Sequence, residues 1–373
     1  RLPEDILQGE IRDIMDLGVK IHLNTPIGKD KKLSDLRKAF DSVFIGTGAQ
    51  KGKVLKIPGE DLEGYVHAVD FLRRVNQGTK VNLGKKVAII GGGNAAIDAS
   101  RTAKRMDAEE VTILYRRTRK EMPADDHEID DAIDEGVNIE FLVSPKRIVG
   151  ENGKVTGIEC LRMELGEPDS SGRRRPIPIE GSEFIIELDT AIPAISQAVD
   201  FGFNEGEEAL RTNRWNTIDA DECMRTNLEG VFSGGDVASG PDTVIEAIAA
   251  GKNAAKYIDK YLSGEELVPE EKPERKVAEQ EQEAQRKPRV KMPELDPKQR
   301  IKSFEEVQLG FSEEQAREEA SRCLQCGICS ECYACVEACQ AGAILHEMTE
   351  EYVNLDVGAV ILAPGFHARP PFA

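Results

Sequence analysis

The sequence is poor in histidine, has no long apolar run, and carries fewer basic than acidic residues. Its five histidines among 373 residues show no pairing at metal-ligand spacing, so we treat all five as structural or exposed. No apolar run approaches the length of a membrane span, and no signal peptide is visible. Lys and Arg total 49 against 68 Asp and Glu, a formal charge of -19. This balance argues against nucleic-acid partners and anionic membrane surfaces, and we expect a cytoplasmic protein.

Cysteine is concentrated in one place, since six of the eight cysteines fall between Cys323 and Cys339. Thiolates at this density are typical of iron–sulfur clusters, for which the bacterial ferredoxin spacing is C-x2-C-x2-C-x3-C. One register of that spacing closes, and its members are Cys329, Cys332, Cys335 and Cys339. Gln340 stands where a proline usually follows. The pattern predicts a 4Fe–4S cluster, and therefore electron transfer.

The remaining cysteines leave alternatives open. A structural zinc site separates its two Cys pairs by a dozen or more residues, which is unlike the adjacent pairs here. Disulfides are disfavoured further, and Cys160 and Cys223 lie in apolar, strand-like surroundings where buried free cysteines are common. Cys323 and Cys326 form a C-x2-C pair. They either join a second cluster, whose other ligands lie outside this chain, or are not a ligand set.

A Gly-rich turn follows a short apolar strand at residues 85–90. Gly91, Gly92, Gly93, Asn94 and Ala95 match the dinucleotide fingerprint G-x-G-x-x-A, which ends at Ala96. An Ala-rich stretch without breakers predicts a helix over 95–106. The first glycine permits the tight turn, the third lets a pyrophosphate approach, and the helix N-terminus offers N–H groups and a positive dipole end.

The second strand of this unit, residues 111–115, ends in two arginines. Arg116 and Arg117 occupy the place where an acidic residue would bind a ribose 2′-hydroxyl. Guanidinium groups suit a 2′-phosphate, so NADP(H) is favoured over NAD(H). The alternative is that either arginine faces solvent.

A third motif combines a strand, an acidic residue and a helix. Gly235 and Asp236 follow an apolar strand, and Pro241 is expected to open a helix near Thr243. The carboxylate can accept a hydrogen bond from a sugar-like hydroxyl, and the helix N-terminus can face an electron-rich ring edge. These features suit a flavin.

Seven segments together resemble the glutamate synthase small subunit family, which includes the flavin half of dihydropyrimidine dehydrogenase. They are RLPEDIL at 1–7, FIGTGAQ at 44–50, IPGED at 57–61, YRR at 115–117, EMPA at 121–124, SGRRR at 171–175 and GGD at 234–236. The resemblance implies an α/β fold with two Rossmann-like domains, in which an NADPH domain is inserted into an FAD domain. It implies an FAD domain at 1–50 and 215–263 and an NADPH domain at 51–214, and it places Gly46, Thr47 and Gly48 among the cofactor-binding residues.

Two departures from the family stand out. The family's own FAD fingerprint lies upstream of these motifs, so the pyrophosphate cradle for FAD is missing from this sequence. Ser196 stands where the family usually has glycine, beside the expected nicotinamide site. We expect the side chain to crowd that turn.

The C-terminal third is organised differently. Residues 264–311 are charged and broken by prolines, which predicts an extended linker wrapping a surface. A capping box from Ser312 to Gln315 predicts a helix that leads into a small ferredoxin-like iron–sulfur segment at 312–346. Residues 347–373 contain a strand ending in Ala-x-Gly, similar to residues 41–49, and are expected to begin a further nucleotide-binding unit. Since the first residue is Arg1, we expect an internal piece of a larger protein. The cysteine segment and this strand resemble flavoproteins of the heterodisulfide reductase A type.

These motifs together predict an NADPH-dependent FAD and iron–sulfur oxidoreductase. NADPH would give hydride to FAD, and single electrons would pass through the cluster to an acceptor protein or a larger subunit. The alternatives are reverse flow from ferredoxin to NADP, or a non-catalytic relay or assembly subunit. Thiol–disulfide reductases are disfavoured, because no C-x4-C pair flanks a flavin motif. Arg173, Arg174 and Arg175 either bind a phosphate or an acidic partner, or form a solvated hairpin turn.

Overall fold

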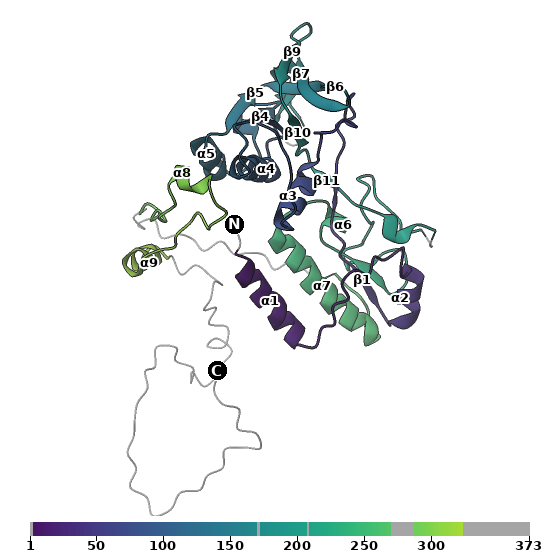
Figure 1. Cartoon of the computed structure of the whole chain (residues 1–373). Helices are drawn as coiled ribbons and strands as arrows, with labels where there is room; N and C mark the ends of the chain where they lie inside the picture. The colour runs from purple at the N-terminus through teal and green to yellow at the C-terminus, as the bar shows by residue number, and fades with distance from the viewer. Residues whose placement is uncertain (1–2, 170–171, 207–208, 270–286, 324–373) are drawn as a thin grey trace, which may run out of the picture. The chain divides into compact units, whose positions relative to one another are not determined.

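The computed structural model describes residues 3–169, 172–206, 209–269 and 287–323 (Figure 1). The chain divides into two units, Arg1–Arg275 with Lys291–Phe311, and Lys276–Val290 with Ser312–Ala373. Cys326, Cys329, Cys332, Cys335 and Cys339, and the strand expected after residue 347, lie outside the described residues. Among the helices that are described, none combines the length and the apolar character needed to cross a membrane.

A four-stranded parallel sheet forms the centre of the first unit. Its order is β10-β3-β4-β5. The strands are β3 (Lys86–Ile90), β4 (Glu110–Tyr115), β5 (Asn138–Phe141) and β10 (Thr190–Pro193). The helices that pack against it are α3 (Ala68–Asn76), α4 (Asn94–Arg105) and α5 (Asp126–Asp134). The expected strand, Gly-rich turn and helix are thus confirmed.

Both faces of this sheet are covered, which explains why its strands are apolar throughout. Because side chains alternate along a strand, Val87 and Ile89 pack with the helices, whereas Ala88 and Ile90 pack on the opposite face. That opposite face meets an antiparallel sheet, so helices and the second sheet lie on either side of β3 and β4 (Figure 1).

The antiparallel sheet has the order β6-β7-β8, with β9 also paired to β7. Its strands are β6 (Val143–Glu151), β7 (Lys154–Pro168), β8 (Arg174–Pro178) and β9 (Phe184–Glu187). Asn152 and Gly153 form the two-residue turn between β6 and β7, with φ of 52° and 80°. Asn-Gly is the preferred pair where both turn residues need positive φ.

A second, smaller region joins segments that are distant in sequence. Strand β1 pairs in parallel with β12, with Ile45 opposite Ser233. Between them the chain passes through β2 and later returns through β11, which pair antiparallel. This path is the one an inserted domain requires, while the domain bounds at 50 and 215 stay a prediction. The elements are α1 (Glu4–Asp16), α2 (Leu33–Ala39), β1 (Val43–Ile45), β2 (Lys51–Gly52), β11 (Gln197–Ala198), β12 (Val231–Ser233), α6 (Asp236–Ser239) and α7 (Val244–Leu262).

Four short helices complete the described chain. They are η1 (Arg119–Glu121), η2 (Gly202–Asn204), α8 (Pro297–Arg300) and α9 (Glu313–Ala320). Ser312 and Gln315 form the expected capping box at the start of α9, with Ser312 Oγ accepting from Gln315 N at 3.2 Å.

A buried ion-pair network ties α4 to the end of α5. The Glu135 carboxylate is fully buried and accepts hydrogen bonds from Arg101 and Arg105 at 2.6 to 3.1 Å. Burial raises the pKa of Glu135, but the hydrogen bonds and charges of the two arginines outweigh it and lower the pKa below its usual value. The carboxylate therefore stays ionised in the folded protein at neutral pH.

We expect Glu135→Gln to lower the free energy of unfolding by about 3–5 kcal/mol, because it removes the carboxylate charge that the two buried guanidinium groups share. Urea denaturation measures this loss. The control is Glu313→Gln, which removes an exposed pair with Arg317 and should cost less than about 1 kcal/mol.

The same network predicts a pH dependence. Since the folded pKa of Glu135 is lowered, its contribution is present above the unfolded pKa of about 4.3 and is lost as the pH falls through the folded value. The difference in stability between the wild type and Glu135→Gln should therefore shrink below about pH 4. A difference that is constant down to the lowest pH would contradict the assignment.

Candidate functional site

The turn between β3 and α4 is closed in by neighbouring strands. Gly91 has φ of 145°, and a Cβ there would lie 2.4 Å from the carbonyl oxygen of Ala194. A Cβ at Gly92 would lie 2.5 Å from the ring of Tyr115. Both positions therefore exclude any side chain. The role of Gly92 depends on a contact with β4 and could not be read from the fingerprint alone.

Gly93 differs from Gly91 and Gly92, because the surrounding protein leaves space for a side chain at this position. A Cβ at this position would meet its nearest atom, Cγ of Pro123, only at 3.8 Å. Gly93 is the N-cap of α4, and the first turn of that helix contains no acidic residue. The N-terminus of α4, with the positive end of the helix dipole, therefore has open space beside it, as a phosphate-binding helix terminus requires.

The loop after β4 is fixed to this turn by hydrogen bonds. The Tyr115 hydroxyl donates to the carbonyl oxygen of Glu121 at 2.6 Å, and Ala124 N donates to Gly92 O at 3.2 Å. The Glu121 carboxylate accepts from the hydroxyl and the N–H of Thr118. The hydrogen bond from the Thr118 hydroxyl is the largest cause of the lowered pKa of Glu121. The EMPA segment, residues 121–124, thus forms the part of the cavity wall that contains Pro123.

A cavity of about 790 Å³ opens in front of the turn. Its wall combines the parallel sheet and its turn with the β2 and β11 segment and with the start of α6, so it joins the two regions of the first unit. Of the residues nominated from the sequence, the wall includes Gly91, Gly92, Gly93, Asn94, Ala95, Arg116, Arg117 and Asp236. It does not include Gly46, Thr47, Gly48, Gly235 or Thr243.

The two nominated arginines have different surroundings. Arg116 is exposed on the cavity wall. Arg117 is 4% exposed, and its Nη2 donates to Asp169 at 2.7 Å while its Nε donates to the carbonyl oxygen of Arg174 at 2.7 Å. Asp169 and Arg174 lie more than fifty residues away in the sequence. The adjacent arginines therefore differ for a reason that local sequence does not reveal.

The flavin-type motif lies at one edge of the small parallel pair. Since Ile45 and Ser233 end their strands side by side, the segments Gly46–Gly48 and Gly235–Asp236 follow at the same edge. Thr243 is the N-cap of α7, and its hydroxyl accepts from Glu246 N at 3.3 Å. The expected helix N-terminus near Thr243 is thus confirmed, whereas the expectation that Pro241 itself opens the helix is wrong, because the helix begins at Val244. Pro241 instead lines the cavity.

Ser196 is held in a conformation that side chains rarely adopt. Its φ is 123°, and its carbonyl oxygen accepts from Lys53 N at 3.2 Å. The next residue, Gln197, pairs with Gly52 in the short β2–β11 ladder. The ladder thus fixes the strained residue, which lines the cavity. The expected crowding of this turn takes the form of backbone strain.

We expect Ser196→Gly to raise the free energy of unfolding by about 1 kcal/mol, because glycine relieves a strain of roughly 1–3 kcal/mol. Chemical denaturation measures the change. The matched control is Ser144→Gly in β6, also in the cavity wall but with ordinary backbone geometry, which should lower stability by about 0.5–1 kcal/mol. Equal destabilisation by both variants would show that Ser196 is unstrained.

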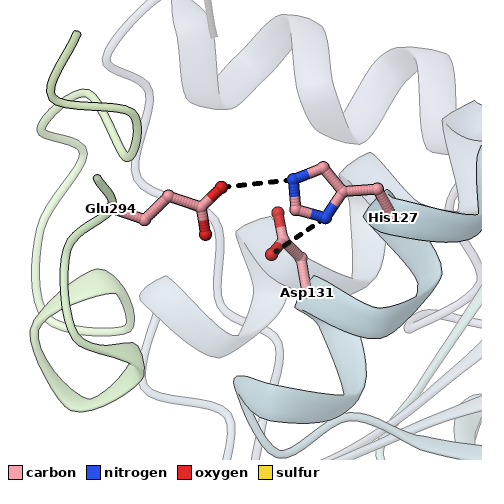
Figure 2. Close-up of side chains that lie close together, drawn as sticks. All are labelled: His127, Asp131 and Glu294. Carbon is pink, nitrogen blue, oxygen red and sulfur yellow. Dashed lines mark hydrogen bonds and ion pairs between the residues drawn. The ribbon is translucent and has the colours of Figure 1, made fainter. Parts of the chain in front are cut away.

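A second cluster joins α5 to the segment before the cysteines. His127 Nε2 lies 3.1 Å from Glu294 and its Nδ1 lies 3.9 Å from Asp131 (Figure 2). The buried guanidinium of Arg300 pairs with Asp131 at 2.9 Å and with Glu294 at 2.6 Å. Arg101 also pairs with Asp131 at 3.2 Å. These cations already neutralise the carboxylates that a metal ion would need, so the cluster fastens residues 291–311 to α5.

Of the three cysteines in the described part of the chain, Cys323 is exposed just after α9, and the other two are buried. Cys160 and Cys223 are both buried. Burial raises the pKa of Cys160 to about 12 and raises that of Cys223. Both buried thiols are therefore protonated at neutral pH and act as small apolar core residues.

The strand order, the Gly-rich turn and the cavity are those of a dinucleotide-binding domain. Residues 7–251 match the family model of pyridine nucleotide-disulphide oxidoreductases, and the chain belongs to this family. Residues 300–359 match a second model, dihydropyrimidine dehydrogenase domain II with a 4Fe-4S cluster.

Three curated relatives are similar over much of the chain. The NADPH-Fe(3+) oxidoreductase subunit beta of Geobacter sulfurreducens is 42% identical over 371 residues, covering 87% of this chain and 54% of the relative. The NADP(+)-dependent formate dehydrogenase subunit beta of Moorella thermoacetica is 43% identical over 347 residues, covering 87% and 48%. The glutamate synthase [NADPH] small chain of Azospirillum brasilense is 34% identical over 285 residues, covering 72% and 58%. The chain thus spans about half the length of the first two relatives.

A solved structure shows the same fold. FprA of Mycobacterium tuberculosis, in complex with NADPH, aligns with a TM-score of 0.53 at 21% identity, covering 64% of this chain and 66% of FprA. The expected α/β fold and the resemblance to the glutamate synthase small subunit family are therefore confirmed. The expectation of an oxidoreductase with nicotinamide, flavin and 4Fe–4S cofactors is confirmed at the level of the family.

Proposed function

We propose that this chain carries electrons between NADPH and a 4Fe–4S cluster through FAD, with NADPH as donor and a protein or larger subunit as acceptor. One observation carries the proposal. A single cavity is lined both by the Gly91–Gly93 turn with Arg116 and by Asp236, which belongs to the flavin-type motif. A nicotinamide coenzyme bound at the turn would extend toward the region where the flavin motif lies.

The residues present fit an NADPH molecule. Gly93 leaves open space before the N-terminus of α4, where the pyrophosphate would bind to free N–H groups. Arg116 supplies a guanidinium on the same wall, suited to a 2′-phosphate. A cavity of about 790 Å³ falls within the usual range for cofactor sites.

The described residues fit part of an FAD site. Asp236 lies after β12, where its carboxylate can accept from a sugar-like hydroxyl, and it already accepts from Asp242 N at 3.3 Å. The N-terminal turn of α7 begins at Thr243 and provides N–H groups. In the proposal these two features contact the polyol chain and the ring of the flavin.

The chemistry requires positioning more than acid–base catalysis. When bound, the cofactors supply hydride transfer and one-electron steps, which need no proton transfer from a side chain. The chain's own residues would bind the coenzyme phosphates, through Arg116 and the α4 N-terminus. The apolar walls from Val54, Leu55 and Ile195 would exclude water from the transfer site.

The electron acceptor and the direction of electron flow belong to the proposal as well. The two relatives from Geobacter and Moorella are beta subunits of an iron-reducing and of a formate-oxidising enzyme, whose names imply opposite use of NADP(H). Their similarity to this chain supports a subunit within a larger complex. Reverse flow, from reduced ferredoxin to NADP, is the second candidate.

A titration separates the enzyme from a relay. The protein is supplied with FAD without oxygen, and its visible spectrum is followed as NADPH is added. Bleaching of the flavin band followed by loss of the brown iron–sulfur absorbance supports the proposal. Iron–sulfur absorbance that does not respond to NADPH, although dithionite bleaches it, would favour the relay.

The cluster itself is testable by metal analysis. Purified without oxygen, the chain should contain about four iron and four sulfide. Cys332→Ala should abolish both, because one of the four thiolate ligands is lost. Cys160→Ala, at a buried thiol of the sheet, should keep them. Stoichiometric zinc without sulfide would reject the cluster.

A further inference from the structure

The hairpin between β7 and β8 is closed by backbone hydrogen bonds next to the cavity. Asp169 N donates to Arg173 O at 2.8 Å, and Gly172 N donates to Asp169 O at 2.9 Å. Gly172 has φ of 77°, which suits glycine in a tight turn. This end of the hairpin is therefore defined by its own hydrogen bonds.

Arg117 fastens the hairpin to the central sheet. Its buried guanidinium holds Asp169 and the carbonyl oxygen of Arg174 together, both at 2.7 Å. Arg116 directly follows the end of β4, and Arg117 is the next residue. The hairpin is therefore fixed beside the wall that carries Arg116. A buried arginine with these two partners has little freedom to move toward a ligand.

The three arginines of the hairpin have different surroundings. Arg173 lines the cavity, together with Arg116. The guanidinium of Arg174 donates back to the carbonyl oxygens of Leu165 and Gly166, at 2.6 and 3.0 Å. Arg175 is exposed and is not part of the cavity wall.

The charges at this end of the cavity repel one another. The pKa of Arg116 is lowered, first because of partial burial and then because Arg117 and Arg173 place positive charge nearby, while Tyr115 and Asp169 act in the opposite direction. Asp169 balances Arg117 by direct contact. Since Arg116 and Arg173 line the same cavity, an anion bound between them would be attracted by both guanidinium groups.

We propose that Arg173 binds the 2′-phosphate of NADP(H) together with Arg116, so that the β7–β8 hairpin helps to determine coenzyme specificity. This proposal rests on the proposed function. A 2′-phosphate carries nearly two negative charges and three acceptor oxygens, which two guanidinium groups from different elements can share. In this proposal Arg117 holds the hairpin in place, and Arg116 and Arg173 bind the phosphate.

The test compares two small probes on the full 373-residue chain by calorimetry. The probe 2′,5′-ADP carries the additional phosphate, and 5′-ADP lacks it. The wild type should bind 2′,5′-ADP more tightly. Arg173→Gln should weaken 2′,5′-ADP binding by about 10- to 100-fold and leave 5′-ADP binding unchanged, because a charge-assisted hydrogen bond to phosphate is lost. Arg173→Lys, which keeps the charge, should restore part of the preference.

Arg175→Gln is the matched control on the same hairpin and should change neither affinity. A wild-type preference for 2′,5′-ADP that survives in Arg173→Gln would overturn the role of Arg173 and leave the proposed function intact. Equal losses for both probes would also overturn it, since the defect would then be structural. A wild type that binds neither probe, or prefers 5′-ADP, would reject NADPH as coenzyme and the hairpin proposal with it.

Discussion

The close approach of the turn after β3 to two neighbouring strands is the constraint on which the site depends. Gly91 leaves no space for a side chain because Ala194 O is adjacent, and Gly92 leaves none because the ring of Tyr115 is adjacent. With any other residue the turn would be pushed outward, and α4 would no longer begin where it does. The space in front of Gly93 and the orientation of the helix dipole both follow from this contact.

The rest of the site is assembled from distant segments around that turn. The loop with Pro123 is held by Tyr115, the hairpin with Arg173 is held by Arg117, and the strained turn at Ser196 is held by the β2–β11 ladder. In each case one short interaction positions a wall of the cavity. In the proposed function these walls would orient the coenzyme relative to the flavin.

The sequence predicted the features whose causes are local. The strand, turn and helix at 85–106 were predicted because the hydrophobic pattern, the glycines and the helix propensity agree within this one short segment. The start of α7 near Thr243 was predicted, but the role of Pro241 was not, since it lies outside the helix and lines the cavity. The difference between Arg116 and Arg117 was not predictable, since it depends on Asp169, 52 residues away. The contact of Gly92 with Tyr115 likewise exists only in the folded sheet.

The central claim is that one coenzyme molecule spans the cavity from the β7–β8 hairpin to the flavin motif. An experimental structure of the chain with bound NADP+ tests it most directly. The account predicts the pyrophosphate at the N-terminus of α4, the 2′-phosphate between Arg116 and Arg173, and the nicotinamide on the side of Ser196 and Asp236. A coenzyme bound in the reverse direction, or outside this cavity, would contradict the account.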